Sequence, residues 1–179
     1  RVPLIDRSEA PAESKTLLDA IHGAFGTTPN MFRAVANSPA ALKSMWGAFG
    51  ALGAGVIPAK LGEQIAVAVA DRNACEYCLA AHTALGRNAG ATAEEMQRAQ
   101  AGESADFSTQ AVLRFALKLV NDRGKVSDSD VRALRDAGFG DEAIVEIVAH
   151  VALNLFTNYV NVAFAVAVDF PAVKLRRVA

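Results

Sequence analysis

The chain carries almost no excess charge, and this excludes one large class of function. It has 18 Lys and Arg residues against 19 Asp and Glu residues in 179, and its formal net charge is −1 at pH 7. Proteins that bind nucleic acid need clustered cations to neutralise phosphates. Because the charges here are mixed along the chain, we expect no nucleic-acid partner.

Cysteine is scarce as well, and the two thiols stand close together. Cys75 and Cys78 are the only cysteines, and the first ten residues lack the charged-then-apolar pattern of a secretory signal. In cytosolic proteins, a close cysteine pair is more often catalytic or metal-binding than structural. We therefore expect a cytoplasmic protein in which this pair has a chemical role.

Strand signals are rare, whereas helical periodicity and capping residues are frequent. Hydrophobic residues make up 52% of the chain and charged residues 21%, which is enough for a large apolar core without disorder. We predict an all-α protein with one domain over residues 1–179, made of an N-terminal helical layer (1–55) and a core with the cysteine motif (56–170). The expected helices are 13–25, 30–36, 39–52, 59–71, 73–88, 92–101, 108–122, 127–138 and a long helix from 141.

Residues 143–168 form an apolar run long enough to cross a bilayer. The run contains polar residues, several of them four positions apart, which would form one polar stripe on a helix. These residues are Glu146, His150, Asn154, Asn158 and Asn161. A single span would expose this stripe to hydrocarbon at considerable cost. We therefore expect a buried helix with polar partners, and no membrane.

A faint internal repeat accompanies this run. Glu63 begins the segment EQIAVAVA and Glu146 begins EIVAHVAL, and the same offset places Asn158 at the position of Cys75. Alanine- and valine-rich helices match one another easily, so chance is one interpretation of the repeat. A duplicated helical hairpin is the other.

The most informative predicted helix carries both cysteines. Asn73 followed three residues later by Glu76 has the form of a capping box, which places the pair in the first two turns of this helix. Cys75, Cys78 and His82 then share one helix face, because their spacing is i, i+3 and i+7. The sequence thus predicts two thiols and an imidazole near a helix N-terminus.

Such a cluster suits redox chemistry. A thiol reacts with peroxide as the thiolate, and a free cysteine with a pKa of about 8.5 is mostly protonated at neutral pH. The helix N-terminus favours the anion, and His82 can accept the proton of Cys78. One thiolate would become a sulfenic acid, and the other would displace water to form a disulfide that an external dithiol reduces. The spacing does not decide which cysteine reacts first.

A carboxylate on the preceding helix completes the expected site. Glu63 stands twelve residues before Cys75. If its helix packs antiparallel against the cysteine helix, this carboxylate could reach the sulfur directly or through water and transfer protons. The candidate catalytic residues are therefore Cys78, Cys75, His82 and Glu63, and we expect neither a metal nor a cofactor.

These residues resemble the signature of a known family, namely a glutamate, eleven further residues and then Cys-x-x-Cys-x-x-x-His. Here the pattern reads Glu63 followed by CEYCLAAH from Cys75 to His82. It is similar to that of alkylhydroperoxidase D and its relatives in the carboxymuconolactone-decarboxylase-like superfamily. The resemblance covers residues from about 30 to 170. The further segments that carry it, towards the peroxidase-related members, are TPNMF (28–32), MW (45–46) and TNYVN (157–161).

The resemblance implies an antiparallel all-α fold that assembles into homo-oligomers, either trimers or hexamers. It implies that Cys78 attacks the peroxide, that Cys75 resolves the intermediate, and that Glu63 and His82 relay protons. The substrate would be a hydroperoxide, and the reductant an external dithiol, a lipoyl-type group or a thioredoxin-like protein. The chain departs from the family at Tyr77, where the best-studied members have a further relay histidine. The efficiency of proton delivery to the thiols depends on this position.

Other interpretations stay open at this point. The pair could serve a general thiol-disulfide oxidoreductase, although the strands of a thioredoxin-like fold are lacking. It could also bind zinc with Glu63 or His150 as fourth ligand, although a second cysteine pair would be usual. A decarboxylase of the same superfamily and a non-enzymatic helical interaction module are the remaining alternatives. Tyr77 and His150 are secondary site candidates, with His150 and the asparagine stripe expected mainly to form internal hydrogen bonds.

Overall fold

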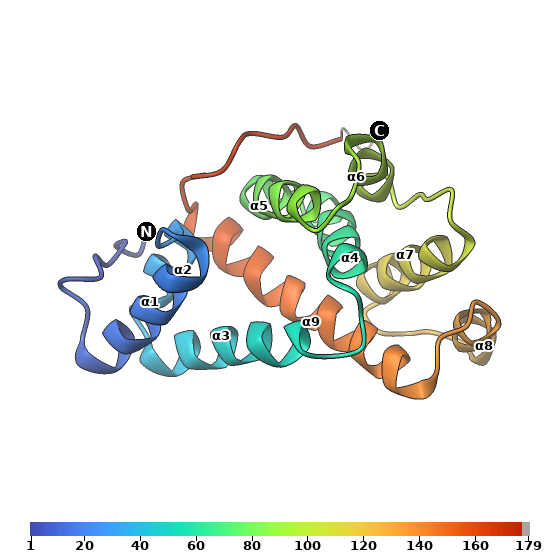
Figure 1. The fold of residues 1–179 in the computed structure, drawn as a ribbon, viewed down its shortest axis with the longest axis horizontal. Helices are drawn as coiled ribbons and strands as arrows, with labels where there is room; N and C mark the ends of the chain where they lie inside the picture. The colour runs from blue at the N-terminus through green and yellow to red at the C-terminus, as the bar shows by residue number, and fades with distance from the viewer. Residues whose placement is uncertain (177–179) are drawn as a thin grey trace.

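The structure is a computed structural model that describes residues 1–176, and every regular element in this range is an α-helix (Figure 1). The predicted all-α class is confirmed. The proposed single domain over residues 1–179 stays a prediction, and its last three residues lie outside the described range. The helices are α1 (Ala12–Phe25), α2 (Asn30–Val35), α3 (Pro39–Gly53), α4 (Ala59–Arg72), α5 (Glu76–Asn88), α6 (Ala93–Gln100), α7 (Phe107–Asn121), α8 (Asp128–Asp136) and α9 (Asp141–Phe164).

Several helices begin at the capping residues that the sequence offers. Ser38 caps α3 through its side chain. Complete capping boxes form at the start of α6, between Thr92 and Glu95, and at the start of α8, between Ser127 and Asp130. Such a cap contributes about 1 kcal/mol, so local sequence is sufficient to determine these boundaries.

The predicted capping box of Asn73 and Glu76 is wrong. Asn73 is the C-cap of α4, and Cys75 is itself the N-cap of α5, because its Sγ accepts a hydrogen bond from the backbone N–H of Cys78 at 3.3 Å. Between the two helices the chain turns through Ala74, which is left-handed with a φ of 53°. Cys75 therefore precedes α5 and does not lie in its first turn.

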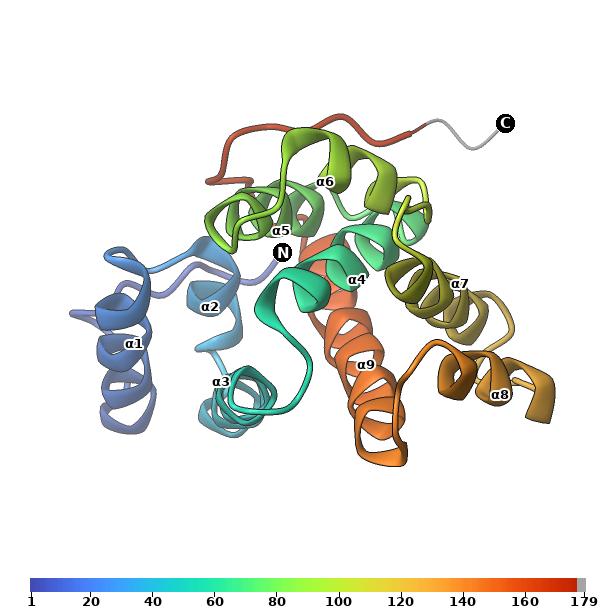
Figure 2. The same cartoon turned by 45° about the vertical axis from the view of Figure 1, so that its right-hand side comes forward.

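The helix α4 lies at the centre of the molecule and packs against α5, α6, α7 and α9. All of its residues from Gln64 to Asp71 are buried. Val67 and Ala70 join an apolar cluster with α1–α3 and α5, whereas Ile65 and Val69 join a second cluster with α7–α9. Figure 2 shows the corresponding arrangement, with α1–α3 on one side, α7 and α8 on the other, and α4 and α9 between them. The α4 helix thus holds both halves of the fold together.

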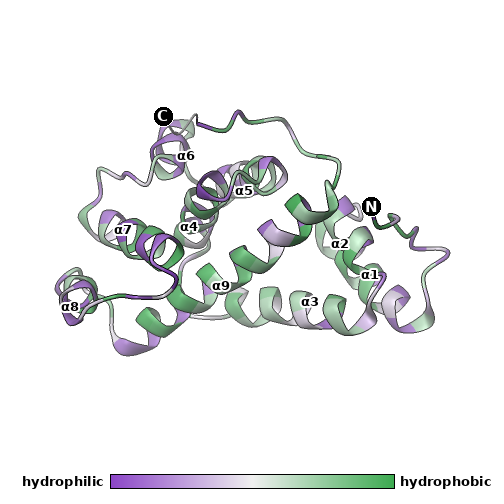
Figure 3. Cartoon of the chain, turned by 180° about the vertical axis from the view of Figure 1, so that it is seen from behind, coloured by the Kyte–Doolittle hydropathy of each residue, from purple (hydrophilic) through white to green (hydrophobic). Residues whose placement is uncertain are grey.

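The helix α9 buries the asparagines of the predicted polar stripe, whereas Glu146 and His150 are half-buried. Asn154, Asn158 and Asn161 all lie in the protein interior. By length and composition α9 could also span a membrane, with a mean hydropathy of 1.4, and hydrophobic residues recur along its ribbon (Figure 3). A lipid environment would not satisfy the buried amides. The exposed apolar residues of α9 are Val145, Val148, Phe156, Tyr159, Val162 and Phe164.

The internal repeat does not correspond to two hairpins. Residues 63–78 span most of α4, the turn after it and the start of α5, whereas the matching residues 146–161 lie within one continuous helix. The shared pattern therefore reflects two helices that are each rich in alanine and valine.

Residues 166–176 form a non-helical segment that we call the C-terminal strap. It runs from the end of α9 over α5 towards α6 (Figure 1). Phe170 packs edge-on against Tyr77 with ring centroids 5.7 Å apart, and the backbone N–H of Arg176 donates to the carboxylate of Asp71 at 2.9 Å. The strap is thus fixed to the surface above the cysteine helix.

We predict that Ile147→Ala lowers the free energy of unfolding by about 2–5 kcal/mol, because Ile147 is fully buried in the α7–α9 cluster and its loss leaves a cavity. The control is Val145→Ala on the same helix, where the side chain is 68% exposed and the change should stay within about 0.5 kcal/mol. Urea unfolding followed by circular dichroism measures both. Equal losses would contradict the orientation of α9.

Candidate active site

Cys75 and Cys78 are free thiols whose Sγ atoms lie 2.7 Å apart. Both residues are only 1% exposed. Cys75 occupies the N-cap of α5 and Cys78 lies in the first turn, so the turn between α4 and α5 brings the sulfurs together. The pair can close a disulfide with little movement of the backbone.

One turn further along α5, His82 contacts a carboxylate from α4. Its Nδ1 lies 2.7 Å from Oε2 of Glu63. The side chain of His82 is 10% exposed and that of Glu63 is 23% exposed. Glu63 therefore contacts the imidazole of His82, whereas contact with the sulfur was one expectation from the sequence. Its partly exposed carboxylate connects the buried ring with solvent.

The helix α9 supplies a hydrogen-bond donor to the thiols. Nδ2 of Asn161 donates to Sγ of Cys78 at 3.2 Å. One turn earlier, Asn158 is fully buried and its Oδ1 accepts a hydrogen bond from Nδ2 of Asn73 at 2.8 Å. The amides of α9 and of the α4–α5 turn thus lie beside the cysteine pair.

The two thiols have opposite electrostatic environments. Burial raises the pKa of the Cys78 thiol, but the hydrogen bond from Cys75 and the positive charge of His82 oppose this effect. The amides of Asn161 and Asn158 act in the same direction, and the pKa of Cys78 falls to about 6. The same hydrogen bond, together with burial, raises the pKa of Cys75. At neutral pH, Cys78 is therefore a thiolate and Cys75 is the thiol that donates to it.

The charge of His82 depends on its two neighbours. Burial lowers the pKa of His82, but the negative charge of Glu63 and the hydrogen bond to it outweigh burial, and the Cys78 thiolate adds to them. The net effect is a raised pKa. The imidazolium thus lies between two anions and can release a proton to a substrate that binds beside Cys78.

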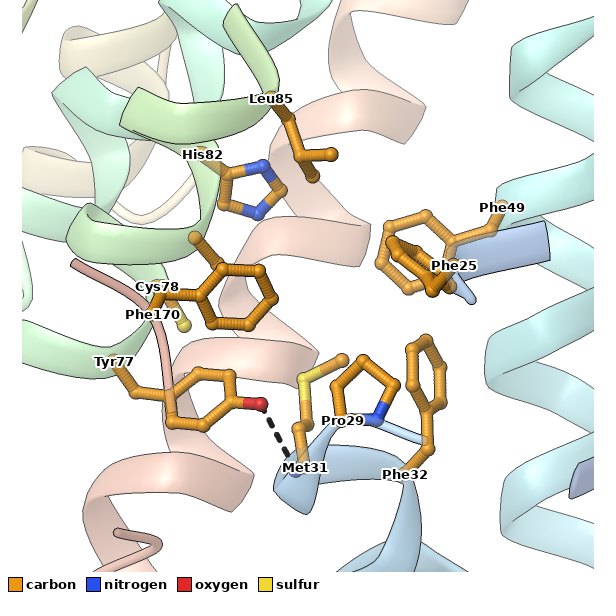
Figure 4. A pocket seen from close by; sticks show the side chains of 11 residues that line it. Phe25, Pro29, Met31, Phe32, Phe49, Tyr77, Cys78, His82, Leu85 and Phe170 are labelled. Atoms are coloured by element: carbon orange, nitrogen blue, oxygen red, sulfur yellow. Dashed lines mark hydrogen bonds between the residues drawn. The ribbon is translucent and has the colours of Figure 1, made fainter. Parts of the chain in front are cut away.

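An apolar pocket opens onto Cys78 (Figure 4). We call it the aromatic pocket, because five of its walls are the rings of Phe25, Phe32, Phe49, Tyr77 and Phe170. His82 and Cys78 lie on one side of it, and α1–α3 supply the opposite side (Figure 4). Its empty space measures about 370 Å³, part of which is open to solvent. No Lys, Arg, Asp or Glu is found among the described residues that line it, so it suits a neutral and apolar ligand.

The secondary candidates differ in their relation to the site. Tyr77 lines the aromatic pocket, and its hydroxyl oxygen accepts a hydrogen bond from the backbone N–H of Met31 at 3.2 Å. Burial raises the pKa of Tyr77, so it stays neutral and ties α5 to α2. His150 packs against Gly62 of α4, where a Cβ would lie 3.2 Å from its Cε1, and burial lowers its pKa although the charges of Glu146 and Glu63 oppose this.

Two features of the site were missed at the level of sequence. The asparagine stripe was expected to form an internal ladder, whereas Asn161 donates to the reactive sulfur. The internal repeat gave no signal for this contact, because residues 146–161 lie within one continuous helix. The aromatic pocket had no signal either, since Phe25, Phe49 and Phe170 come from three distant segments.

The zinc interpretation finds no geometric basis in the part of the chain that the structure describes. Within residues 1–176, no three His, Cys, Asp or Glu side chains are grouped so that they could hold a metal ion. The carboxylate of Glu63 is engaged with His82 instead. The arrangement is one for proton transfer beside a thiolate.

Fold and site together define an all-helical protein built around a Cys-x-x-Cys pair with an adjoining Glu–His pair. Residues 39–122 match the carboxymuconolactone decarboxylase family. A peroxidase-related protein from Ralstonia eutropha JMP134, described as an alkylhydroperoxidase AhpD core, superposes with a TM-score of 0.83 at 25% identity, covering 96% of this chain and 92% of the other. These matches support the superfamily of alkylhydroperoxidase D and carboxymuconolactone decarboxylase, as the signature predicted.

Other solved structures share the fold. A peroxidase-related protein from Silicibacter sp. TM1040 has a TM-score of 0.80 at 26% identity, covering 93% of this chain and 88% of the other. The debrominase Bmp8 has a TM-score of 0.79 at 22% identity, covering 94% and 91%. No curated protein matches the chain in sequence.

We predict that Asn161→Ala raises the pKa of Cys78 by about 1–2 units, because a hydrogen bond to a charged group contributes about 1.5–3 kcal/mol and one unit corresponds to about 1.4 kcal/mol. The pH dependence of Cys78 alkylation measures this shift. Asn154→Ala is the matched control, since Nδ2 of Asn154 donates to the carbonyl of His150 on its own helix. An unchanged profile in the Asn161 variant would show that the amide does not stabilise the thiolate.

Proposed function

We propose that the protein is a thiol-dependent peroxidase that reduces organic hydroperoxides through a disulfide between Cys75 and Cys78. The observation that carries the proposal is the polarised pair. A thiolate at Cys78 receives hydrogen bonds from Cys75 and Asn161 and faces an apolar pocket. Thiolate character and access to the oxidant are the two properties that peroxide reduction requires.

In the first step, the Cys78 thiolate attacks the terminal oxygen of the hydroperoxide. An S–O bond forms, the O–O bond breaks, and the electron pair leaves with the alkoxide. The His82 imidazolium protonates this alkoxide, and Glu63 restores the proton from solvent. The products are an alcohol and the sulfenic acid of Cys78.

In the second step, Cys75 resolves the sulfenic acid. Once Cys78 has lost its negative charge, the hydrogen bond that held the proton on Cys75 no longer opposes its ionisation. Its sulfur attacks Sγ of Cys78, an S–S bond forms, and the hydroxyl leaves as water with the proton that Cys75 gives up. An external dithiol then reduces the disulfide and is itself oxidised. No cofactor takes part in these steps, and the cytoplasm supplies suitable thiols.

The aromatic pocket favours neutral, apolar hydroperoxides over hydrogen peroxide. Its rings can bury the organic group of a substrate such as cumene hydroperoxide. A carboxymuconolactone substrate carries carboxylates and would need several cationic partners, whereas His82 is the only one among the described lining residues. We therefore favour the peroxidase reaction over the decarboxylase reaction. We also favour it over general thiol-disulfide exchange, because the pocket leads to Cys78.

Reductive dehalogenation is the second candidate. A cysteine variant of the debrominase Bmp8 is known in complex with 2,3,4-tribromopyrrole, and an aromatic pocket beside a thiolate suits such a flat halogenated ring. In this reaction the two thiols would give two electrons, bromide would leave, a proton would take its place on the ring, and the cysteines would become a disulfide. Bromide release from a bromopyrrole, measured beside cumene hydroperoxide consumption, separates the two activities.

We predict that Cys78→Ser abolishes peroxide consumption in the presence of dithiothreitol. Cys75→Ser should still react once and stop at a sulfenic acid that a dimedone probe captures, because the serine hydroxyl can donate to Cys78 but cannot form a disulfide. Thiol titration and mass spectrometry after stoichiometric cumene hydroperoxide measure both. Full turnover in the Cys78 variant would rule the mechanism out.

The pH dependence of the first step follows from the pKa of Cys78. Because that pKa is lowered to about 6, the thiolate is present above this pH, and the rate of oxidation should fall about tenfold per pH unit below it. Glu63→Gln removes the charge that raises the pKa of His82, so Cys78 loses cationic support and the midpoint moves to higher pH.

Single-turnover oxidation over a pH series measures this midpoint. Glu142→Gln on the exposed side of α9 is the control, because it removes a carboxylate far from the thiols and should leave the midpoint in place. A Glu63→Gln profile that coincides with the unmodified protein, in a variant with an unchanged melting curve, would exclude Glu63 from the proton relay.

A further inference from the structure

The two cysteines line two different pockets. Cys78 lines the aromatic pocket, and Cys75 lines a second pocket on the other side of Tyr77. The second pocket, which we call the strap pocket, lies between the start of α5, the end of α9 and the first residues of the C-terminal strap. It has about 730 Å³ of empty space, part of it open to solvent. Its walls include Ala74, Glu76, Asn161, Val162, Ala165 and Ala167.

We propose that the strap pocket is the entry site of the external reductant, a slender neutral thiol that attacks Sγ of Cys75. The proposal rests on the redox cycle described above, and it adds where the electrons enter and which sulfur receives the attack. Oxidant and reductant would thus approach the same disulfide from two separate pockets.

The geometry supports attack at Cys75. Thiol-disulfide exchange needs an incoming sulfur in line with the S–S bond, so that the far sulfur can leave. A thiol in the strap pocket meets Sγ of Cys75 first and has Cys78 behind it. The incoming thiolate forms a mixed disulfide with Cys75 and Cys78 leaves as a thiolate. A second reductant thiol then attacks the reductant sulfur of this mixed disulfide, releases Cys75 and leaves the reductant oxidised.

The electrostatics of the pair favour the same direction. In thiol-disulfide exchange, the sulfur with the lower pKa leaves faster. Asn161 and His82 stabilise the Cys78 thiolate, and both stay in place when the disulfide opens. Attack at Cys78 would instead expel Cys75, which lacks these two stabilising contacts and whose pKa is raised by burial.

The size and charge of the strap pocket restrict the reductant. Cys75 is only 1% exposed, so a thiol fixed on a broad protein surface would not reach its sulfur, whereas a small thiol or one on a thin arm would. Among the described residues that line the strap pocket, Glu76 is the only charged one. Its carboxylate disfavours anionic thiols.

The first experiment measures reduction apart from peroxide chemistry. The full chain is oxidised to the disulfide with diamide, and its reduction by dithiothreitol is followed by mass spectrometry. Ala167→Phe and, independently, Val162→Trp should slow this reduction about tenfold by filling the strap pocket. Their matched controls, Ala172→Phe in the strap and Val148→Trp on α9, are exposed residues outside the pocket and should match the unmodified protein.

The outcomes separate the two proposals. If reduction is slowed in both pocket variants while oxidation by stoichiometric cumene hydroperoxide keeps its rate, the entry site is supported. If reduction is unchanged in both, the strap pocket is not the entry site, whatever the peroxide result. If peroxide forms no disulfide in the unmodified protein although diamide does, the proposed peroxidase function fails alone.

The second experiment identifies the attacked sulfur. The oxidised protein is mixed briefly with mercaptoethanol, quenched with acid and alkylated, and fragmentation mass spectrometry locates the mixed disulfide. We expect it on Cys75, with Cys78 alkylated, and the reverse pattern would overturn the proposal. Glu76→Gln should accelerate reduction by anionic mercaptoethanesulfonate about threefold more than by neutral mercaptoethanol, and an equal effect on both would exclude approach past Glu76.

Discussion

A buried thiolate at Cys78 is the constraint on which the rest of this structure depends. An isolated anion in an apolar core would take up a proton, because burial disfavours charge. Here three different kinds of group oppose that effect, namely the thiol of Cys75, the amide of Asn161 and the imidazolium of His82. The imidazolium is in turn held by Glu63. Reactivity therefore depends on side chains from three helices, α4, α5 and α9, which contact either the Cys78 sulfur or the His82 imidazolium beside it.

The fold provides these donors through one irregular turn and one long helix. The left-handed Ala74 turns the chain after α4 and makes Cys75 the N-cap of α5. The thiol of Cys75 can therefore accept a hydrogen bond from the backbone and donate one to the sulfur of Cys78. Glu63 and His82 then meet because α4 packs directly on α5. The helix α9 passes behind this hairpin with its polar stripe inward. The stripe that costs stability in an apolar helix is thus compensated by its contact with the thiolate and with Asn73.

Local patterns in the sequence were sufficient for most of the fold and for half of the site. Caps such as Ser38, Thr92 and Ser127 set helix starts because the interaction spans only three residues. The spacing of Cys75, Cys78 and His82 is likewise a property of one helix. The N-cap role of Cys75 was not predicted, because Asn73 offers a competing capping signal. The tertiary hydrogen bond of Asn73 with Asn158 decides between the two. The aromatic pocket was not predicted at all, because Phe25 packs on Phe32 and Phe170 packs on Tyr77, and only the tertiary fold brings these rings around one pocket.

The difference in pKa between Cys75 and Cys78 favours a defined role for each sulfur in both the oxidation and the reduction step of the proposed cycle. The groups that lower the pKa of Cys78 make it the nucleophile towards a peroxide, and they make it the better leaving group when the disulfide is reduced. A symmetric pair would have no such preference and would permit attack on either sulfur. Since each sulfur also lines its own pocket, the electrostatic and the steric preferences agree. A change in the lining of the aromatic pocket would therefore alter which oxidising substrate binds without altering how electrons enter.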